Sequence, residues 1–359
     1  MNRMLCSFVV LLSVSVVHAD DIEILKSVGS AAEGAAAARA ASAALVKGGA
    51  KNLLPVLKAF NGSSVLATNW LRATFESIAD AELKAGGSLP KDDLIAFVKS
   101  TSESPVARRL AYEWLLKRSP QLEESLIPNM LLDPSPEFRR DAVARIIEQA
   151  KTLQGGEATE LYRKALSGAV HEDQVKIIAK SLREAGDDVD LQQHFGFLAA
   201  WKVIGPFDNK DMKGFPVVYE PEKNLDMDAE YDGQLGKVKW AELTTDDDYG
   251  IVDIGKEIEN FKGSVMYATT TFNSDKEQTL ELRLGTPNAW KLWVNGALVF
   301  EREEYHRGTR MDQYRVPVKL EAGPNTILLK ICQNEQDQPW AQDYQFQLRV
   351  CDNTGSGVK

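Results

Sequence analysis

The most chemically varied stretch of the sequence is EYHRGTRMDQY, which runs from Glu304 to Tyr314. Tyr305 and His306 could take up a proton, and Arg307 and Arg310 could hold a carboxylate between paired N–H groups. Together these residue types could support a polysaccharide lyase, in which tyrosine or histidine removes the proton α to a uronic acid while arginine neutralises that acid. The same four side chains could instead bind sugar hydroxyls or a carboxylate without any reaction.

A purely structural role fits the same stretch. Its arginines could pair with Glu303, Glu304 or Asp312, and its tyrosines could pack beneath the loop, because charge-rich loops are often solvated or self-paired. The acidic character of this half of the chain also opposes a polyanionic substrate. The composition of the stretch leaves the ligand-binding and structural interpretations open.

Two tryptophans are further candidates for recognition, because a flat ring can stack on the apolar face of a sugar. Trp293 lies in a predicted strand and Trp340 in a predicted loop, 336–342. A core position is the competing interpretation for each, since tryptophan buries a large area. The complete candidate ligand-binding set is Trp293, Tyr305, His306, Arg307, Arg310 and Trp340.

Other kinds of site are not predicted. Asp246-Asp247-Asp248 and the pair Asp208/Asp211 lack the alternating oxygen spacing of a calcium loop, and the histidines are too isolated for zinc. The sequence has no serine or cysteine nucleophile motif and no phosphate-binding loop. We therefore predict no catalytic residue, no metal site and no cofactor.

The composition is that of a globular chain with a targeting segment. The 359 residues are 44% hydrophobic and carry a net charge of -10 without a basic cluster, which argues against a nucleic-acid partner. Arg3, the apolar run Leu5–Val17 and the small-residue ending at Ala19 predict a signal peptide over residues 1–19. No later stretch is apolar enough to span a membrane. We expect a secreted or periplasmic protein after cleavage near Ala19.

The chain changes character near residue 198. Residues 20–198 carry apolar residues at helical spacing, whereas residues 199–354 carry short alternating segments separated by Gly and Asn turns. This pattern predicts a helical domain, then an all-β jelly-roll sandwich, then a disordered tail over residues 355–359. The connection 192–201 is too apolar for a free linker, so it should pack between the two halves.

The helical half contains an internal repeat. Ser104-Pro105 and Ser135-Pro136 each open a predicted helix, where serine can cap and proline fits the first turn. In the second copy an apolar stripe is expected, formed by Phe138, Ala142, Val143, Ile146 and Ile147. The arrangement resembles HEAT-type repeats, which stack into an α-solenoid. An irregular helical bundle is the alternative.

The clearest strand signal is the dipeptide Asn295-Gly296, which favours a two-residue hairpin turn. The expected cross-strand pairs are Val294 with Ala297, Trp293 with Leu298, and Leu292 with Val299. Both faces of this hairpin are apolar near the turn, although a sandwich strand should expose one of them. The face with Trp293 and Leu298 therefore needs a cover, which could be a loop, the helical domain or a ligand.

Two motifs in the second half carry a family resemblance. WKLWVNG, Trp290–Gly296, and LEAGPNTILLK, Leu320–Lys330, resemble the W-x-N-G … L-x-x-G-x-N-x-L-x-x-K pattern of galactose-binding-like modules that accompany carbohydrate-active enzymes. Trp201–Asn209 resembles the opening of such modules in secreted bacterial proteins that join them to helical repeats. The resemblance implies a module that binds carbohydrate or a protein partner, and it carries over no catalytic residue.

Two cysteines, Cys332 and Cys351, lie outside the predicted signal peptide. If the segments 326–333 and 344–350 form a hairpin, strand geometry places the two residues much further apart than a disulfide allows. We expect two unpaired thiols.

These observations predict a secreted, non-enzymatic binding or scaffold protein. The sandwich would recognise carbohydrate or a protein partner, and the helical domain would offer a second interaction surface. Two other hypotheses remain: a lyase-type enzyme that uses the loop of Tyr305, His306 and Arg307, and a purely structural assembly protein.

Overall fold

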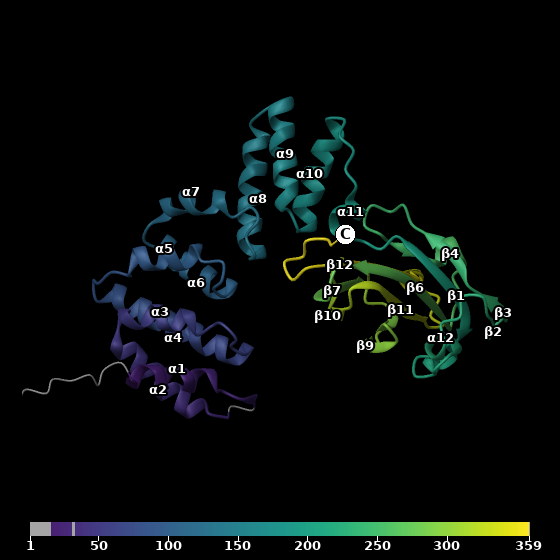
Figure 1. Cartoon of the computed structure of the whole chain (residues 1–359), viewed down its shortest axis with the longest axis horizontal. Coiled ribbons are helices and arrows are strands. Elements are labelled where there is room, and N and C mark those ends of the chain that lie inside the picture. Colours follow the sequence, from purple (N-terminus) through teal and green to yellow (C-terminus); the bar gives the residue numbers. More distant parts are fainter. Residues whose placement is uncertain (1–15, 31–32, 359) are drawn as a thin grey trace, which may run out of the picture. The chain divides into compact units, whose positions relative to one another are not determined.

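The computed structural model describes residues 16–30 and 33–358, and the chain divides into two compact units (Figure 1). The first unit holds the described residues up to Gln154 together with Ser167–Ala169, and the second holds residues 155–166 and the chain from Val170 onward. Most of the predicted signal peptide, residues 1–15, lies outside the described residues. Within the described ranges, no helix combines the length and apolar character needed to cross a membrane.

The first unit is helical, because its apolar residues recur with the period of a helix and pack against one another. α4 begins after Ser64, whose Oγ accepts the Ala67 N–H at 3.2 Å. α1 packs with α2 and α4, α3 packs with α4, and α5 packs with α6. The elements are α1 (Val16–Lys26), α2 (Ala35–Gly48), α3 (Leu53–Lys58), α4 (Val65–Lys84), α5 (Lys91–Lys99), α6 (Pro105–Leu116), α7 (Glu123–Leu126) and α8 (Pro136–Lys151).

The repeated Ser-Pro motif is organised by an aspartate rather than by the serines. Arg108 on α6 is fully buried and donates to both carboxylate oxygens of Asp133, at 2.8 and 2.6 Å. Asp133 Oδ1 also accepts the Ser135 N–H at 2.8 Å. The predicted serine caps at Ser104 and Ser135 are wrong, since neither side chain accepts a bond from its helix. The predicted apolar stripe of α8 is confirmed as buried.

The second unit contains two antiparallel sheets. One has the strand order β4-β1-β6-β11-β8-β9 and the other β10-β7-β12-β5, while β2 and β3 form a separate ribbon. The strands are β1 (Ala200–Asp208), β2 (Glu230–Gly233), β3 (Gly236–Lys239), β4 (Ala241–Thr244), β5 (Val252–Asp253), β6 (Ser264–Ser274), β7 (Gln278–Gly285), β8 (Ala289–Val294), β9 (Ala297–Arg302), β10 (Tyr314–Leu320), β11 (Gly323–Gln333) and β12 (Gln345–Cys351). The helices are α9 (Gly156–Gly168, shared with the first unit), α10 (Glu172–Glu184), α11 (Leu191–Phe195), α12 (Glu220–Lys223) and α13 (Ile254–Glu257).

One hydrophobic core joins the two sheets. Met266 and Leu329 from the six-stranded sheet pack in the same buried cluster as Leu282 and Leu348 from the four-stranded sheet. Because alternate residues of each strand point to this core, the two sheets form a sandwich. The fold therefore has the β-sandwich character that the alternating segments predicted.

The Asn295-Gly296 hairpin forms between β8 and β9. Both turn residues have positive φ, 50° and 79°, as this turn requires. The first two predicted pairs, Val294 with Ala297 and Trp293 with Leu298, are present. The third is wrong, because a register shift next to Trp293 pairs Leu292 with Phe300 instead.

The outer face of the six-stranded sheet is covered by the chain between β1 and β4. Trp293 packs there with Tyr267 and Leu328, and Phe215 and Tyr219 from the covering segment join them. The cover is fixed by the buried Lys330, whose Nζ lies 2.9 Å from Glu222 Oε1 and donates to Val217 O at 2.6 Å. Of the three covers that the sequence allowed, a loop is the one that lies over Trp293.

The predicted hairpin between β11 and β12 is wrong, because these strands belong to opposite sheets. Tyr344, which precedes β12, still donates its hydroxyl hydrogen to Ile331 O across the core at 2.9 Å. Cys332 therefore lies in one sheet and Cys351 in the other, and both thiols are free and buried.

Helices α10 and α11 belong to the same compact unit as the sandwich. Arg183 on α10 donates to both carboxylate oxygens of Asp248, at 2.6 and 2.7 Å. The side-chain amide of Gln192 donates to the backbone oxygens of Thr245 and Asp247, at 3.0 and 2.8 Å. These bonds tie the helices to the loop after β4, so this unit begins well before the change of composition near residue 198.

The end of the chain returns to the sandwich. The Val358 N–H donates to Val350 O at 3.0 Å, and Gly357 forms a bridge with Cys351. Arg349 also donates to Gly355 O at 2.9 Å. Residues 355–358 thus lie against β12, in the segment for which a disordered tail was predicted.

Candidate ligand cleft

An open cleft of about 750 Å3 lies at one end of the sandwich and contains part of the predicted site. Its walls are the loop between β9 and β10 and the segment between β11 and β12, with Met212 from the covering segment. The lining residues are Met212, Tyr305, His306, Asn334, Glu335, Gln336, Asp337, Gln338 and Trp340. We call this the Trp340 cleft.

Trp340 supplies an exposed aromatic surface in the cleft. Its side chain is 62% exposed and lies in a short turn, Pro339–Ala341. The turn is held by Lys262 Nζ, which donates to Ala341 O at 2.8 Å, and by Asn260 Nδ2, which donates to Gln342 O at 2.7 Å. Tryptophan is enriched at interfaces, because its ring offers a large apolar area together with a polar N–H.

His306 contacts the Trp340 ring edge-on, with the ring centroids 5.2 Å apart and the planes at 87°. Its Nε2 lies 2.8 Å from Asn334 Oδ1, and that oxygen also accepts the Gln336 N–H at 3.1 Å. Because an amide oxygen accepts, His306 Nε2 must be the donor. In the tautomer that carries its hydrogen on Nε2, Nδ1 is a hydrogen-bond acceptor.

Tyr305 forms the inner wall of the cleft and is held by the buried Asn209. Asn209 Nδ2 donates to the Tyr305 hydroxyl at 3.2 Å and to Gln333 O at 2.9 Å. Burial raises the pKa of Tyr305. The hydroxyl therefore stays protonated near neutral pH and can donate a hydrogen bond, but it is a poor proton acceptor.

The charge in the cleft is negative. Glu335 and Asp337 line it, and none of the described lining residues is lysine or arginine. Glu335 Oε2 accepts the Asp211 N–H at 2.9 Å, which fixes one carboxylate at the rim. A ligand with its own negative charge would be repelled at this position.

The other predicted residues lie outside the cleft lining. Arg307 is 61% exposed and its Nε lies 3.2 Å from Glu304 Oε2. Arg310 is exposed and forms no ion pair with a described residue. Trp293 is buried beneath the covering segment. The structure thus brings Tyr305, His306 and Trp340 together and separates them from both arginines and from Trp293.

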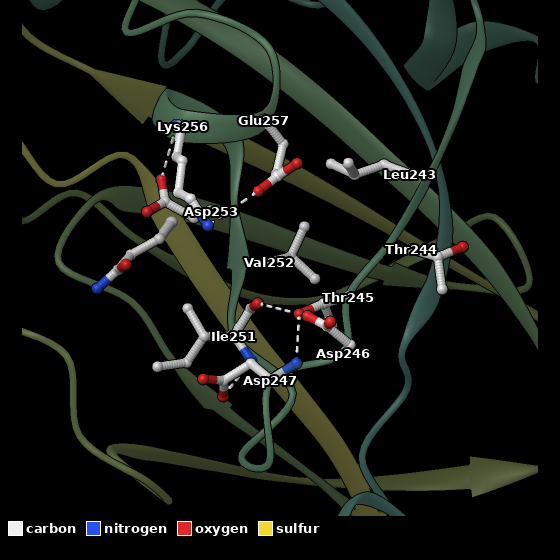
Figure 2. Close-up of a pocket in the computed structure, with 11 residues that line it drawn as sticks. Leu243, Thr244, Thr245, Asp246, Asp247, Ile251, Val252, Asp253, Lys256 and Glu257 are labelled. Carbon is white, nitrogen blue, oxygen red and sulfur yellow. Dashed lines mark hydrogen bonds and ion pairs between the residues drawn. The ribbon is translucent and has the colours of Figure 1, made fainter.

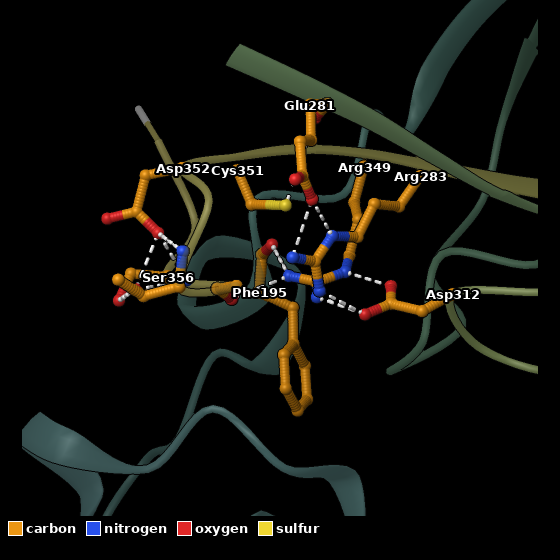
Figure 3. Close-up of polar contacts among 10 residues, drawn as sticks. Phe195, Glu281, Arg283, Asp312, Arg349, Cys351, Asp352 and Ser356 are labelled. Atoms are coloured by element: carbon orange, nitrogen blue, oxygen red, sulfur yellow. Dashed lines mark hydrogen bonds and ion pairs between the residues drawn. The ribbon is translucent and has the colours of Figure 1, made fainter. Parts of the chain in front are cut away.

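In the loop between β9 and β10, Asp312 is the residue that makes the main structural contacts. Its carboxylate accepts from Arg349 Nε at 2.6 Å and Nη2 at 2.7 Å, and from Arg283 Nη1 at 2.5 Å (Figure 3). Burial alone would raise the pKa of Asp312, but the two guanidinium groups lower it below its ordinary value. The arginines that hold this aspartate come from β7 and β12, not from the loop itself.

A second cavity, of about 740 Å3, follows β4 and is lined by two residues of the acidic run, Asp246 and Asp247 (Figure 2). Asp247 Oδ1 accepts the Tyr249 and Ile251 N–H groups at 2.9 and 3.2 Å, so it organises the turn. Asp248 is held by Arg183. Across the described residues, no group of three or more histidine, cysteine, aspartate or glutamate side chains is placed to hold a metal ion.

Two asparagines that position residues of the Trp340 cleft were not predicted from the sequence. Asn209 and Asn334 position Tyr305 and His306, yet they lie 96 and 28 positions away from them along the chain. The polar run Asn334–Gln338 directly after a long apolar strand was the available signal, because such runs often form loops that carry function.

Comparisons with known proteins give only partial likenesses. No family model matches the chain, and no curated protein matches it. A β-glucosidase from Kluyveromyces marxianus in complex with glucose aligns over 44% of this chain and 17% of its own, with 8% identity and a TM-score of 0.27. A family 35 carbohydrate-binding module from Clostridium thermocellum aligns over 24% of this chain and 71% of its own, with 15% identity and a TM-score of 0.18.

A GH31 α-xylosidase from Xanthomonas citri also aligns, over 44% of this chain and 16% of its own, with 15% identity and a TM-score of 0.21. This chain thus spans less than a fifth of the two glycosidases. The prediction that the protein is not an enzyme is contradicted by these matches, which include glycoside hydrolases, and we drop it.

Proposed function

We propose that the sandwich unit binds carbohydrate in the Trp340 cleft. The observation that carries this proposal is the exposed ring of Trp340, which His306 contacts edge-on in a cleft whose other lining residues, apart from Met212, have polar groups. An aromatic face with hydrogen-bonding groups around it suits a sugar, which has both an apolar face and a rim of hydroxyls. His306 Nδ1 and the amides of Gln336 and Gln338 supply groups for those hydroxyls.

The charge of the cleft favours neutral sugars over uronic acids. Glu335 and Asp337 would repel a carboxylate, and the arginines that could have neutralised it lie outside the lining. The same arrangement disfavours the lyase hypothesis, because the raised pKa of Tyr305 keeps its hydroxyl protonated. Arg307 is engaged by Glu304 instead of facing Tyr305 and His306 across the cleft.

A glycan array with the full chain tests this proposal. We expect binding to neutral glycans, weaker signals for uronic-acid glycans, and a loss of about tenfold or more in affinity for Trp340→Ala. Trp340→Phe should retain much of the binding because it keeps a flat ring. Leu235→Ala removes another highly exposed apolar side chain and should change nothing. Unchanged binding by Trp340→Ala, or silence of the wild-type chain on all glycans, would exclude the proposal.

We also propose that the protein is secreted or periplasmic and that its helices α3–α8 are HEAT-like repeats. The first proposal is supported by the apolar run before Ala19. The second is supported by the packing of α3 with α4 and of α5 with α6, and by the Arg108–Asp133 bond between successive repeats. The site for a carbohydrate or protein partner would then be carried outside the cytoplasm.

A further inference from the structure

The first unit has an open groove of about 820 Å3 between α6, α7 and α8. It lies on the polar side of these helices, away from the stripe of α8 that packs in the core. The lining residues are Arg109, Tyr112, Glu113, Leu116, Glu123, Asp141, Ala144, Arg145, Glu148, Gln149 and Thr152. We call this the α6–α8 groove.

The two cations of the groove are already engaged. Arg109 Nε lies 3.0 Å from Glu113 Oε1, its Nη1 donates to Asp141, and its guanidinium stacks 5.2 Å from the centre of the Tyr112 ring. Arg145 is bound through both terminal nitrogens by Glu124, which lies outside the lining. Neither guanidinium is therefore available to an anionic ligand.

The carboxylates are in excess. Four acidic side chains line the groove against two basic ones, which leaves a net charge of -2. Glu123 is exposed and forms no ion pair with a described residue, and Glu148 pairs only with the exposed Lys151. The nearby carboxylates Glu123 and Asp141 contribute, after burial, to raising the pKa of Tyr112 to about 12. Its hydroxyl stays protonated and can accept as well as donate a hydrogen bond.

Between these charges the groove offers an apolar floor. Leu116 and the exposed Ala144 stand on facing helices, and no bulky side chain projects from α8 at Ala144. A groove with an apolar floor and an acidic rim is complementary to a segment that carries both aliphatic and basic side chains. We propose that the α6–α8 groove binds a lysine- and arginine-containing peptide segment of a protein partner.

The test compares two fluorescein-labelled peptides binding to the full chain by anisotropy, one of leucine, lysine and arginine and one in which glutamate replaces every basic residue. We expect saturable binding of the basic peptide, weakened by added salt, and none of the acidic one. Glu123→Gln/Glu148→Gln should weaken binding by about fivefold to tenfold. Ala144→Arg, at an exposed helical position, should abolish it by filling the groove.

The matched control is Glu76→Gln/Asp80→Asn, which removes the same number of charges from α4, outside the groove. It should bind the basic peptide as the wild type does, and thermal melts should show that all variants remain folded. Equal weakening by the control variant would mean that only the overall acidity of the chain attracts the peptide. That result, equal binding of the two peptides, or full binding by Ala144→Arg would overturn the proposal.

Discussion

Asp312 anchors one end of the loop between β9 and β10, which also carries Tyr305 and His306. It accepts bonds from Arg283 and Arg349, which are both nearly fully buried. Arg349 in turn donates to Phe195 O at 3.0 Å, so the loop, β12 and α11 share one polar cluster. We predict that Asp312→Asn lowers the free energy of unfolding by about 3 to 5 kcal/mol, because it leaves the buried Arg349 without its counter-charge and Arg283 with only that of Glu281. Denaturant unfolding measures the change.

The control for this prediction is Glu303→Gln, which removes a charge from an exposed position of the same loop. It should change stability by less than about 0.5 kcal/mol. If Asp312→Asn were as mild as Glu303→Gln, the cluster would contribute little to the fold. Other contacts would then have to hold the loop between β9 and β10 in place beside the Trp340 cleft.

The lowered pKa of Asp312 predicts that the free energy of unfolding depends on pH. Its pKa in the folded protein lies below the ordinary value of about 3.9, so the unfolded chain binds the proton more readily. The stabilisation by Asp312 is therefore complete above about pH 4 and is lost as the pH falls through the ordinary pKa and then the lowered one. The stability gap between wild type and Asp312→Asn should narrow below about pH 4. A constant gap down to pH 2 would contradict this assignment.

At the scale of elements, the covering segment between β1 and β4 depends on the buried pair of Lys330 and Glu222. Burial lowers the pKa of Lys330, and the hydrogen bond from Nζ to Glu222 opposes that shift. We predict that Lys330→Met and Glu222→Gln each lower the free energy of unfolding by about 3 kcal/mol. The double variant should cost less than the sum, because it leaves no charge buried alone.

The exposed pair Lys319–Glu277, with 2.7 Å between its charged atoms, is the matched comparison. The same pair of substitutions there should cost less than about 1 kcal/mol and show little coupling. Additive effects at Lys330 and Glu222 in a double-mutant cycle would mean that the covering segment is held by its aromatic packing instead.

The elements of the sandwich could be predicted because their signals are local. Alternation marks β7, β8 and β10, and Asn295-Gly296 sets its own turn whatever surrounds it. The pairing of β11 with β12 could not be predicted, since adjacency along the chain does not tell whether a strand stays in its sheet or crosses to the other. The register shift beside Trp293 could not be predicted either, because it depends on how the strands pack and not on the residues of the turn.

The candidate site could likewise be predicted only where its signal was local. The chemistry of Tyr305, His306 and Trp340 was visible in their side chains, but their convergence depends on Asn209 and Asn334, which act across long stretches of chain. Arg307 and Arg310 looked equally suitable in the sequence. Only the folded loop shows that they lie outside the cleft, because side chains that are neighbours in an irregular loop point in unrelated directions.

At the scale of the whole molecule, the compact units and the composition divide the chain at different places. Composition changes near residue 198, but Arg183 and Gln192 bind the loop after β4, and Phe195 accepts from Arg349. We therefore predict that a chain beginning at Gly155 unfolds in a single cooperative transition. A chain beginning at Ala199 should melt roughly 5 °C or more lower, because Asp248 and Arg349 lose these partners.

Calorimetry of the two fragments decides whether the sandwich unit begins near Gly155 or near Ala199. The variant Arg183→Ala in the longer fragment shows how much of the difference in melting temperature comes from the ion pair with Asp248. The ion pair with Asp248 is partly exposed, so this substitution alone should account for only a small part of the difference. The larger part should come from Phe195, whose ring packs against Phe197 and Tyr249, at 5.8 and 6.0 Å between centroids. Equal melting of the two fragments would show that α10 and α11 add nothing to the sandwich, and the functional boundary would then be the one that composition marks.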